Sequence, residues 1–290
     1  MLNRRQIYGS LGLIGAAQAL PAVMSTAAAQ TAAPQVTPAP TGPSTLERIL
    51  STKKLRIAVV ANQEPYFRKN LQTSQWTGFC LAMARDIAEQ MGVELETLES
   101  TWGNSVLDLQ ANKIDMAFGL NPTPRRALVV DFPPAMFYNV SSLVCRRGFT
   151  ASAWDELNRP EVKITYDLGT SREVIVKRFA PRAQHIAYRT SPECVLAVAT
   201  GRADAFACSV FLGLAARKQN RNLGEFIMPT PQVRTVTTAA IQYDRDGRFR
   251  QFISAWTEFN RGSGQVREWI LAALGEMGIE PGDVPAGLEF

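Results

Sequence analysis

Apolar and polar positions follow two alternating periods along most of the chain. Residues 55–60 (LRIAVV) form a short apolar run rich in β-branched side chains, which is typical of a buried strand. Residues 78–91 repeat apolar side chains at helical spacing, and Gly92 follows them where a helix C-cap favours glycine. The same reading continues with a strand at 93–98, a helix at 105–111 and a strand at 114–118. Such β-α-β units predict an α/β fold with a parallel sheet covered on both faces.

A second series of the same kind begins after Trp154. Its predicted strands are 162–166, 185–188 and 203–208, and its predicted helices are 169–179 and 192–200. The pattern then changes to an extended segment at 235–243 and two amphipathic helices at 248–260 and 265–274. Two α/β lobes that share a C-terminal segment fit this order better than one continuous sheet.

The first residues of the chain have the features of an export signal. Residues 3–8 (NRRQIY) contain a twin arginine, residues 11–23 are apolar, and residues 27–29 supply the small side chains of a cleavage site. The apolar stretch is short for a membrane span, so we expect a signal peptide at 1–29 rather than a retained anchor. The general secretory and the twin-arginine routes both remain open. Residues 30–44, rich in Pro, Ala and Thr, predict a flexible linker.

The composition suits a globular protein, because 46% of the 290 residues are hydrophobic and 20% are charged. Removal of residues 1–29 lowers the formal net charge from +5 to +3, since Arg4 and Arg5 are the only charged residues there. The remaining positive charge is spread along the chain without a basic block. Nucleic-acid binding therefore has no support.

The four cysteines predict no metal site. None has C-x-x-C spacing, and His185 is the single histidine of the chain. We therefore expect no metal and no cofactor. Cys194 and Cys208 flank one helix–strand unit, and both a disulfide between them and free buried thiols remain open.

Two segments predict sites for a negative charge. In residues 121–126 (NPTPRR), Thr123 and Pro124 suit the start of a helix, yet Arg125 and Arg126 follow directly. Cations are unfavourable in the first turn of a helix, so an anion is expected nearby. Residues 169–171 (GTS) also begin a predicted helix, whose N–H groups and hydroxyls can bind an anion.

The order of these segments resembles the family 3 solute-binding proteins, the extracytoplasmic receptors of polar-amino-acid ABC transporters. The resemblance covers roughly residues 46–274. It is carried by KKLRIAVVANQEPYF, GFCLAMARDIAEQMG, LDLQANKIDMAFGLNPTPRRALVVDFPPAMF, ITYDLGTSREVIVKRF and ATGRADAFACSVFL. It implies a two-lobe periplasmic binding protein fold (type II) with two hinge strands. The first lobe would comprise 45–145 and 237–290, and the second lobe 146–236.

The resemblance implies a set of ligand-binding residues in the first lobe. Arg126 would bind a ligand carboxylate, although pairing with Asp131 is the alternative. Asn121 would form a hydrogen bond with the ligand. Trp102 would pack on it, or else be a core tryptophan, and Tyr66 would contact it or only support the first cleft loop.

In the second lobe, Thr170 and Ser171 lie at the predicted helix start after Gly169, and on lobe closure this anion site would hold the same carboxylate as Arg126. The family's usual aspartate for an α-ammonium group falls on Ser209 instead. A buried ammonium without a carboxylate partner is costly, so a basic amino acid is not expected, and the ligand is an amino acid of another kind or a related organic acid without an amino group. Glu64 or Glu173 remains an alternative for the lost acid.

The sequence thus predicts a periplasmic, monomeric solute-binding protein that delivers a small carboxylate-bearing solute to an ABC permease in the inner membrane. No catalysis is expected. Two alternatives stay open. One is an exported dehydratase acting on prephenate or arogenate with Glu173 as acid. The other is a sensory or accessory binding protein.

Overall fold

The computed structural model describes residues 42–244, 246–286 and 288. All of these residues belong to one compact unit of the chain. The predicted signal peptide and residues 30–41 of the predicted linker lie outside the described residues. Within the described part of the chain, we find no helix whose length and apolar character would let it cross a membrane.

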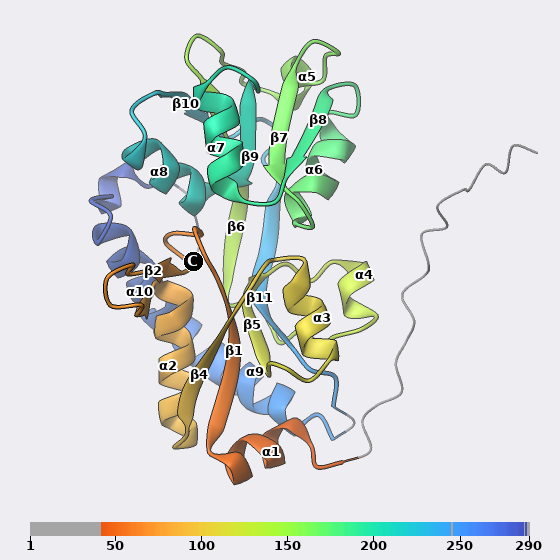
Figure 1. The fold of residues 1–290 in the computed structure, drawn as a ribbon, viewed down its shortest axis with the longest axis vertical. Helices are drawn as coiled ribbons and strands as arrows, with labels where there is room; N and C mark the ends of the chain where they lie inside the picture. The colour runs from red at the N-terminus through yellow and green to blue at the C-terminus, as the bar shows by residue number, and fades with distance from the viewer. Residues whose placement is uncertain (1–41, 245, 287, 289–290) are drawn as a thin grey trace, which may run out of the picture. The chain divides into compact units, whose positions relative to one another are not determined.

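Strands and helices alternate along the described chain (Figure 1), mostly within about two residues of the predicted bounds. The strands are β1 (Lys54–Val60), β2 (Arg68–Lys69), β3 (Trp76–Thr77), β4 (Glu94–Ser100), β5 (Met116–Leu120), β6 (Phe137–Arg146), β7 (Lys163–Asp167), β8 (Gln184–Tyr188), β9 (Ala205–Ser209), β10 (Leu223–Ile227) and β11 (Arg234–Ile241). The helices are α1 (Thr45–Thr52), α2 (Phe79–Met91), α3 (Asn104–Gln110), α4 (Pro124–Ala127), α5 (Trp154–Leu157), α6 (Ser171–Phe179), α7 (Ser191–Ala199), α8 (Val210–Gln219), α9 (Arg248–Gly262), α10 (Gln265–Gly275) and the 3-10 turn η1 (Pro281–Asp283).

The main sheet has the strand order β4-β1-β5-β11-β6-β9-β7-β8, with β10 paired to β6. In what we call the first lobe, β1 is parallel to both β4 and β5. In the second lobe, β7 is parallel to both β8 and β9. The expected parallel β-α-β units therefore form in each lobe, and antiparallel strands join them.

Strands β6 and β11 run through both lobes. The first part of β6, Phe137 to Val140, pairs with β11, and from Ser141 onward β6 pairs with β9. Strand β11 pairs with β6 up to Thr237 and with β5 from Thr238. The change of partner in β6 comes after Val140, and the lobe boundary at 145 stays a prediction.

Each lobe has an apolar core on both faces of its strands. Leu55, Ile57 and Val59 of β1 belong to a core with α2 and α10, whereas the alternate residue Ala58 faces a second cluster. In β9, Ala205 and Ala207 likewise face one cluster, and Phe206 and Cys208 face another. Strands buried on both faces read as continuous apolar runs, as found in the sequence.

The predicted helix signals are present in the structure. Gly92 has φ 63° and its N–H donates to the end of α2, as a C-cap does. Thr123 caps α4, and Pro124 is the first residue of that helix. All four cysteines are free and buried, so Cys194 and Cys208 do not form the disulfide that the sequence left open.

A buried carboxylate ties α1, β1 and the start of β5 together in the first lobe. Asp115 is fully buried, and its carboxylate accepts from Arg48 of α1 and, at 2.7 Å, from Arg56 of β1. The backbone N–H of Arg56 also donates to it at 2.9 Å.

We therefore expect Asp115→Ala to lower the free energy of unfolding by about 3–5 kcal/mol, because two guanidinium groups lose their buried partner. Urea denaturation measures this change. The control is Glu96→Ala, which removes an exposed pair with Lys54 and should cost about 1 kcal/mol or less. Equal losses in the two variants would contradict this account.

Candidate functional site

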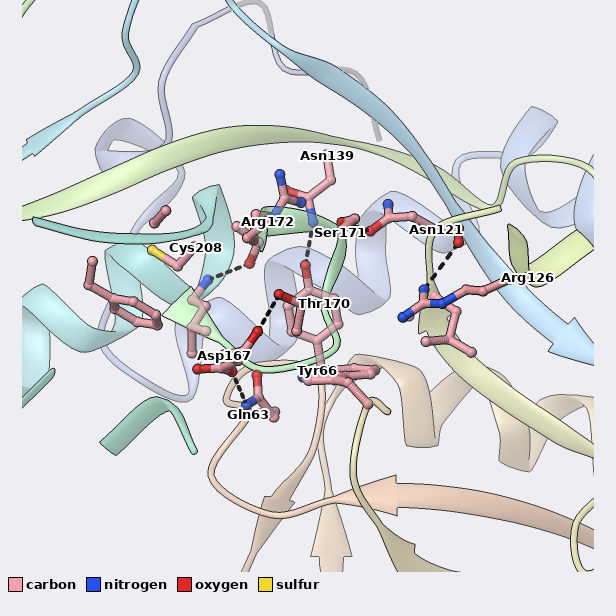
Figure 2. Close-up of a pocket in the computed structure, with 17 residues that line it drawn as sticks. Gln63, Tyr66, Asn121, Arg126, Asn139, Asp167, Thr170, Ser171, Arg172 and Cys208 are labelled. Carbon is pink, nitrogen blue, oxygen red and sulfur yellow. Dashed lines mark hydrogen bonds between the residues drawn. The ribbon is translucent and has the colours of Figure 1, made fainter. Parts of the chain in front are cut away.

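A cavity lies between the lobes, at the carboxyl ends of the parallel strands (Figure 2), where α/β proteins commonly bind ligands. Its volume is about 60 Å³. One water needs about 10–15 Å³ of such space, so about four to six waters, or one small solute, would fill it. The lining residues come from both lobes: Gln63, Tyr66, Trp102, Gly119, Leu120, Asn121, Arg126, Asn139, Asp167, Thr170, Ser171, Arg172, Phe206, Ala207, Cys208, Ser209 and Leu212.

The structure brings all of the predicted site residues to this one cavity. They are Tyr66, Trp102, Asn121, Arg126, Thr170, Ser171 and Ser209. They come from chain segments far apart in sequence. They meet at the cavity because each follows or ends a strand whose carboxyl end points to the same place. Their contact with a ligand remains a prediction.

Arg126 reaches from the first lobe to the second. Its guanidinium donates to the carbonyl oxygen of Asn121 at 3.2 Å and to that of Gly169 at 2.9 Å. Burial lowers the pKa of Arg126, and no carboxylate contributes to that shift. Asp131, the predicted alternative partner, forms no ion pair with Arg126 in the described chain. The guanidinium thus has carbonyl contacts but no counter-charge from the residues that the structure describes.

Asn121 connects three parts of the cavity wall. Its amide nitrogen donates to the carbonyl oxygen of Val236 at 2.8 Å and to the hydroxyl of Thr237 at 3.1 Å. Its amide oxygen accepts from the hydroxyl of Ser171 at 2.6 Å. Both ends of the amide are therefore engaged by the protein. Asn121 is accordingly better placed to position α6 and β11 than to form the predicted hydrogen bond with a ligand.

The N-terminus of α6 forms the opposite wall. The Thr170 hydroxyl donates to the carbonyl oxygen of Asp167 at 2.7 Å, and Ser171 is the first residue of the helix. The side chain of Thr170 makes no cap hydrogen bond to the helix. First-turn N–H groups therefore remain at the cavity, as expected for an anion site.

The two predicted aromatic residues pack against each other at the base of the cavity. The ring centroids of Tyr66 and Trp102 lie 6.1 Å apart in an edge-to-face arrangement. Tyr66 is held by the start of α2, because the N–H of Phe79 donates to Pro65 and that of Cys80 to Tyr66 itself. A Cβ atom at Gly78 would lie 2.4 Å from the Tyr66 carbonyl oxygen, so this close approach requires glycine.

Ser209, where the family's usual aspartate is missing, has a local structural role. Its hydroxyl accepts from the N–H of Leu212 at 3.1 Å and so caps α8. Neither Glu64 nor Glu173, the predicted substitutes, lines the cavity. Glu173 instead pairs with Lys177 at 2.6 Å.

The carboxylate of the cavity is Asp167, which the sequence reading did not single out. It ends β7 two residues before Gly169, and that position was the available signal. Gln63 of the first lobe donates to it at 3.0 Å, and Ser191 of the second at 2.6 Å. Burial raises the pKa of Asp167, although hydrogen bonds from Ser191 and Gln63 oppose the shift.

Two further lining residues were missed. Arg172 follows Ser171 in α6, is 7% exposed, and donates to the hydroxyl of Ser141 in β6. Asn139 of β6 donates to the Tyr66 hydroxyl, and its side-chain oxygen is buried without a hydrogen-bond partner among the described residues. Such an acceptor suits a hydroxyl or amino donor of a ligand. In the described residues, no group of three or more potential metal ligands is present.

Comparison with known proteins identifies the family. The family model of the bacterial extracellular solute-binding proteins, family 3, matches residues 55–280. Cyclohexadienyl dehydratase from Pseudomonas aeruginosa is 22% identical over 229 residues, which cover 78% of this chain and 84% of the dehydratase. The glutamine-binding protein from Geobacillus stearothermophilus is 26% identical over 185 residues, which cover 62% of this chain and 70% of that protein.

Solved structures show the same fold. An amino acid ABC transporter substrate-binding protein from Streptococcus pneumoniae, bound to L-arginine, has a TM-score of 0.72 at 20% identity, covering 81% of this chain and 99% of that one. An ancestral amino acid-binding protein, described as a precursor of cyclohexadienyl dehydratase, has a TM-score of 0.70 at 24% identity, with the same coverage. The expected α/β fold, the type II periplasmic binding protein fold, is thereby confirmed.

The raised pKa of Asp167 predicts a pH dependence of stability. The folded protein holds the Asp167 proton more tightly than the unfolded chain, so ionisation destabilises the fold as pH rises above the ordinary carboxyl range near 4. Asp167→Asn removes this titration while keeping an acceptor for Gln63 and Ser191. We expect the variant to gain stability relative to the natural protein at pH 7.5, and to gain less at pH 4.

Urea denaturation at the two pH values measures the difference, with the exposed Asp155→Asn as control. The stability of Asp167→Asn relative to the natural protein could instead stay constant or fall as pH rises. Either result would show that the hydrogen bonds to Asp167 outweigh burial in setting its pKa.

Proposed function

Since the chain belongs to the bacterial extracellular solute-binding proteins, family 3, we propose that it captures a small carboxylate-bearing solute for an ABC importer. The solute would bind in the cavity between the lobes and be delivered to a permease in the inner membrane. The predicted signal peptide at 1–29 and the linker that follows support a periplasmic location. We propose that the protein acts as a monomer.

The observation that carries this proposal is the environment of Arg126. Its guanidinium lines the cavity, its hydrogen bonds go to two carbonyl oxygens, and no acid of the described chain pairs with it. A guanidinium matches a carboxylate with two parallel hydrogen bonds. The N–H groups at the start of α6 face the same cavity from the second lobe and suit the same anion.

Solute capture would close the lobes around strands β6 and β11. Both strands change their pairing partner between the lobes, so backbone rotation at these points moves one lobe against the other. The closed form would be recognised by the permease. A sensory or accessory partner in place of the permease would use the same capture step.

The likeness to cyclohexadienyl dehydratase makes an enzyme the second candidate. Glu173, the acid expected for that reaction, pairs with Lys177 and lies outside the cavity lining. Asp167 is the acid within the cavity, and its raised pKa is a property that general acids share. A dehydratase would therefore use Asp167, but the three donors already on this carboxyl favour a positioning role.

One prediction of this function concerns Arg126 as the anchor for the ligand carboxylate. A thermal-shift screen of residues 30–290 against amino acids and amine-free carboxylates identifies the best ligand, because a ligand that binds only the folded state raises Tm. Arg126→Ala should weaken that ligand by about 2–5 kcal/mol, the cost of truncating one side of a buried charge pair. The neighbouring Arg125 is exposed, and Arg125→Ala is the matched control, expected to keep the affinity. Unchanged affinity in Arg126→Ala would refute the anchor.

Another prediction of this function is that the protein does not catalyse a dehydratase reaction. Incubation of the purified protein with prephenate or arogenate should leave the substrate concentration unchanged, as followed by chromatography against a protein-free sample. Consumption that disappears in Asp167→Asn would establish the enzyme instead of the binding protein.

A further inference from the structure

Arg172 is a buried cation that the carboxylate anchor leaves unexplained. Its side chain lines the same cavity as Arg126 (Figure 2), and the residue is 7% exposed. Its hydrogen bond goes to the neutral hydroxyl of Ser141. In the described chain, no aspartate or glutamate lies within ion-pair distance of the Arg172 guanidinium.

The side chains around Arg172 supply no negative charge at neutral pH. Tyr66 and Cys208 are the ionisable groups that interact with it. Burial raises the pKa of the Tyr66 phenol well above its ordinary value and that of the Cys208 thiol to about 12. Both groups are therefore neutral at pH 7. A buried charge without a counter-charge is costly, so an anion is expected at this position.

Asp167 does not fill this role. Its carboxyl oxygens accept from Gln63, Ser191 and Cys194, and Arg172 is not among its donors. The cavity therefore presents two guanidinium groups, on Arg126 and Arg172, against one carboxyl that is engaged elsewhere. One ligand carboxylate would compensate a single guanidinium and leave the other without an anion.

We propose that Arg172 is a second anion anchor, and that the solute carries two negatively charged groups, one for Arg126 and one for Arg172. This inference rests on the proposed solute-binding function and narrows its ligand to small dicarboxylates, including acidic amino acids. Phe206 and Leu212, which line the same cavity, suit a short carbon chain between the two anionic groups.

Matched ligand pairs test the second anchor without changing the protein. Isothermal titration calorimetry of residues 30–290 compares succinate with succinamate, glutarate with glutaramate, L-aspartate with L-asparagine and L-glutamate with L-glutamine. Each pair differs by one carboxylate replaced with an isosteric amide. In the pair that binds best, we expect the diacid to bind at least about thirty-fold more tightly, the lower end of the loss when one side of a buried charge pair is removed.

Three variants assign this preference to Arg172. Arg172→Gln should reduce the ratio between diacid and half-amide to about one, and Arg172→Lys, which keeps a positive charge, should retain part of it. Arg178 lies on the same helix and is exposed, so Arg178→Gln should leave the ratio unchanged. Circular dichroism checks that each variant folds. If Arg172→Gln does not fold, the ligand pairs measured on the natural protein decide the question.

The outcomes separate the two proposals. If diacids and half-amides bind equally well and Arg126→Ala abolishes both, the second anchor is wrong and the carboxylate-binding function stands. If neither this panel nor the wider thermal-shift screen of carboxylates yields a ligand, the proposed function itself fails. A diacid preference that persists in Arg172→Gln would place the second anion elsewhere and overturn the role of Arg172.

Discussion

The structure depends on the exchange of hydrogen-bonding partners along β6. This strand is bonded to β11 in its first part and to β9 in its second, so one continuous backbone carries the register of both lobes. Asn139 and Ser141 lie on either side of the exchange, and their side chains contact Tyr66 and Arg172. The cavity is therefore anchored to a strand whose pairing belongs to neither lobe alone.

The second organising constraint is the positive charge of the cavity. A protein interior solvates ions poorly, and each guanidinium there needs acceptors. Arg126 obtains two backbone carbonyl oxygens and Arg172 obtains a hydroxyl. Carbonyl and hydroxyl oxygens orient a guanidinium without neutralising it. The contacts of the two arginines thus fix their positions without neutralising their charge, and the proposed preference for anionic solutes rests on this.

Much of the fold could be predicted from hydrophobic periodicity, and the exceptions have physical reasons. Strand β1 is predicted by its apolar run, and α2 by its helical repeat and by Gly92. Helix α8 was missed, because its first six residues are apolar or glycine and all but one are buried, so no polar face marks a helical period.

The site was predictable where a residue follows a strand and a recognisable motif, as for Arg126 and Ser171. Asp167 and Arg172 flank the 169–171 segment and were missed for another reason. Their roles depend on which way each side chain points, which is set by the pairing of β7 and by the packing of α6. No period in the sequence reports that direction.

Gln63 has a consequence for the speed of solute exchange. Its side chain joins the first lobe to Asp167 and Ser191 of the second through protein atoms alone, so these bonds are available whether the cavity is filled or empty. Each such bond contributes about 0.5–1.5 kcal/mol to keeping the lobes together. For the proposed solute capture, the free protein would thereby spend more time in the arrangement that binds, which would raise the apparent affinity. The same bonds would have to break before a solute enters or leaves, so lobe opening, rather than diffusion, would set the residence time.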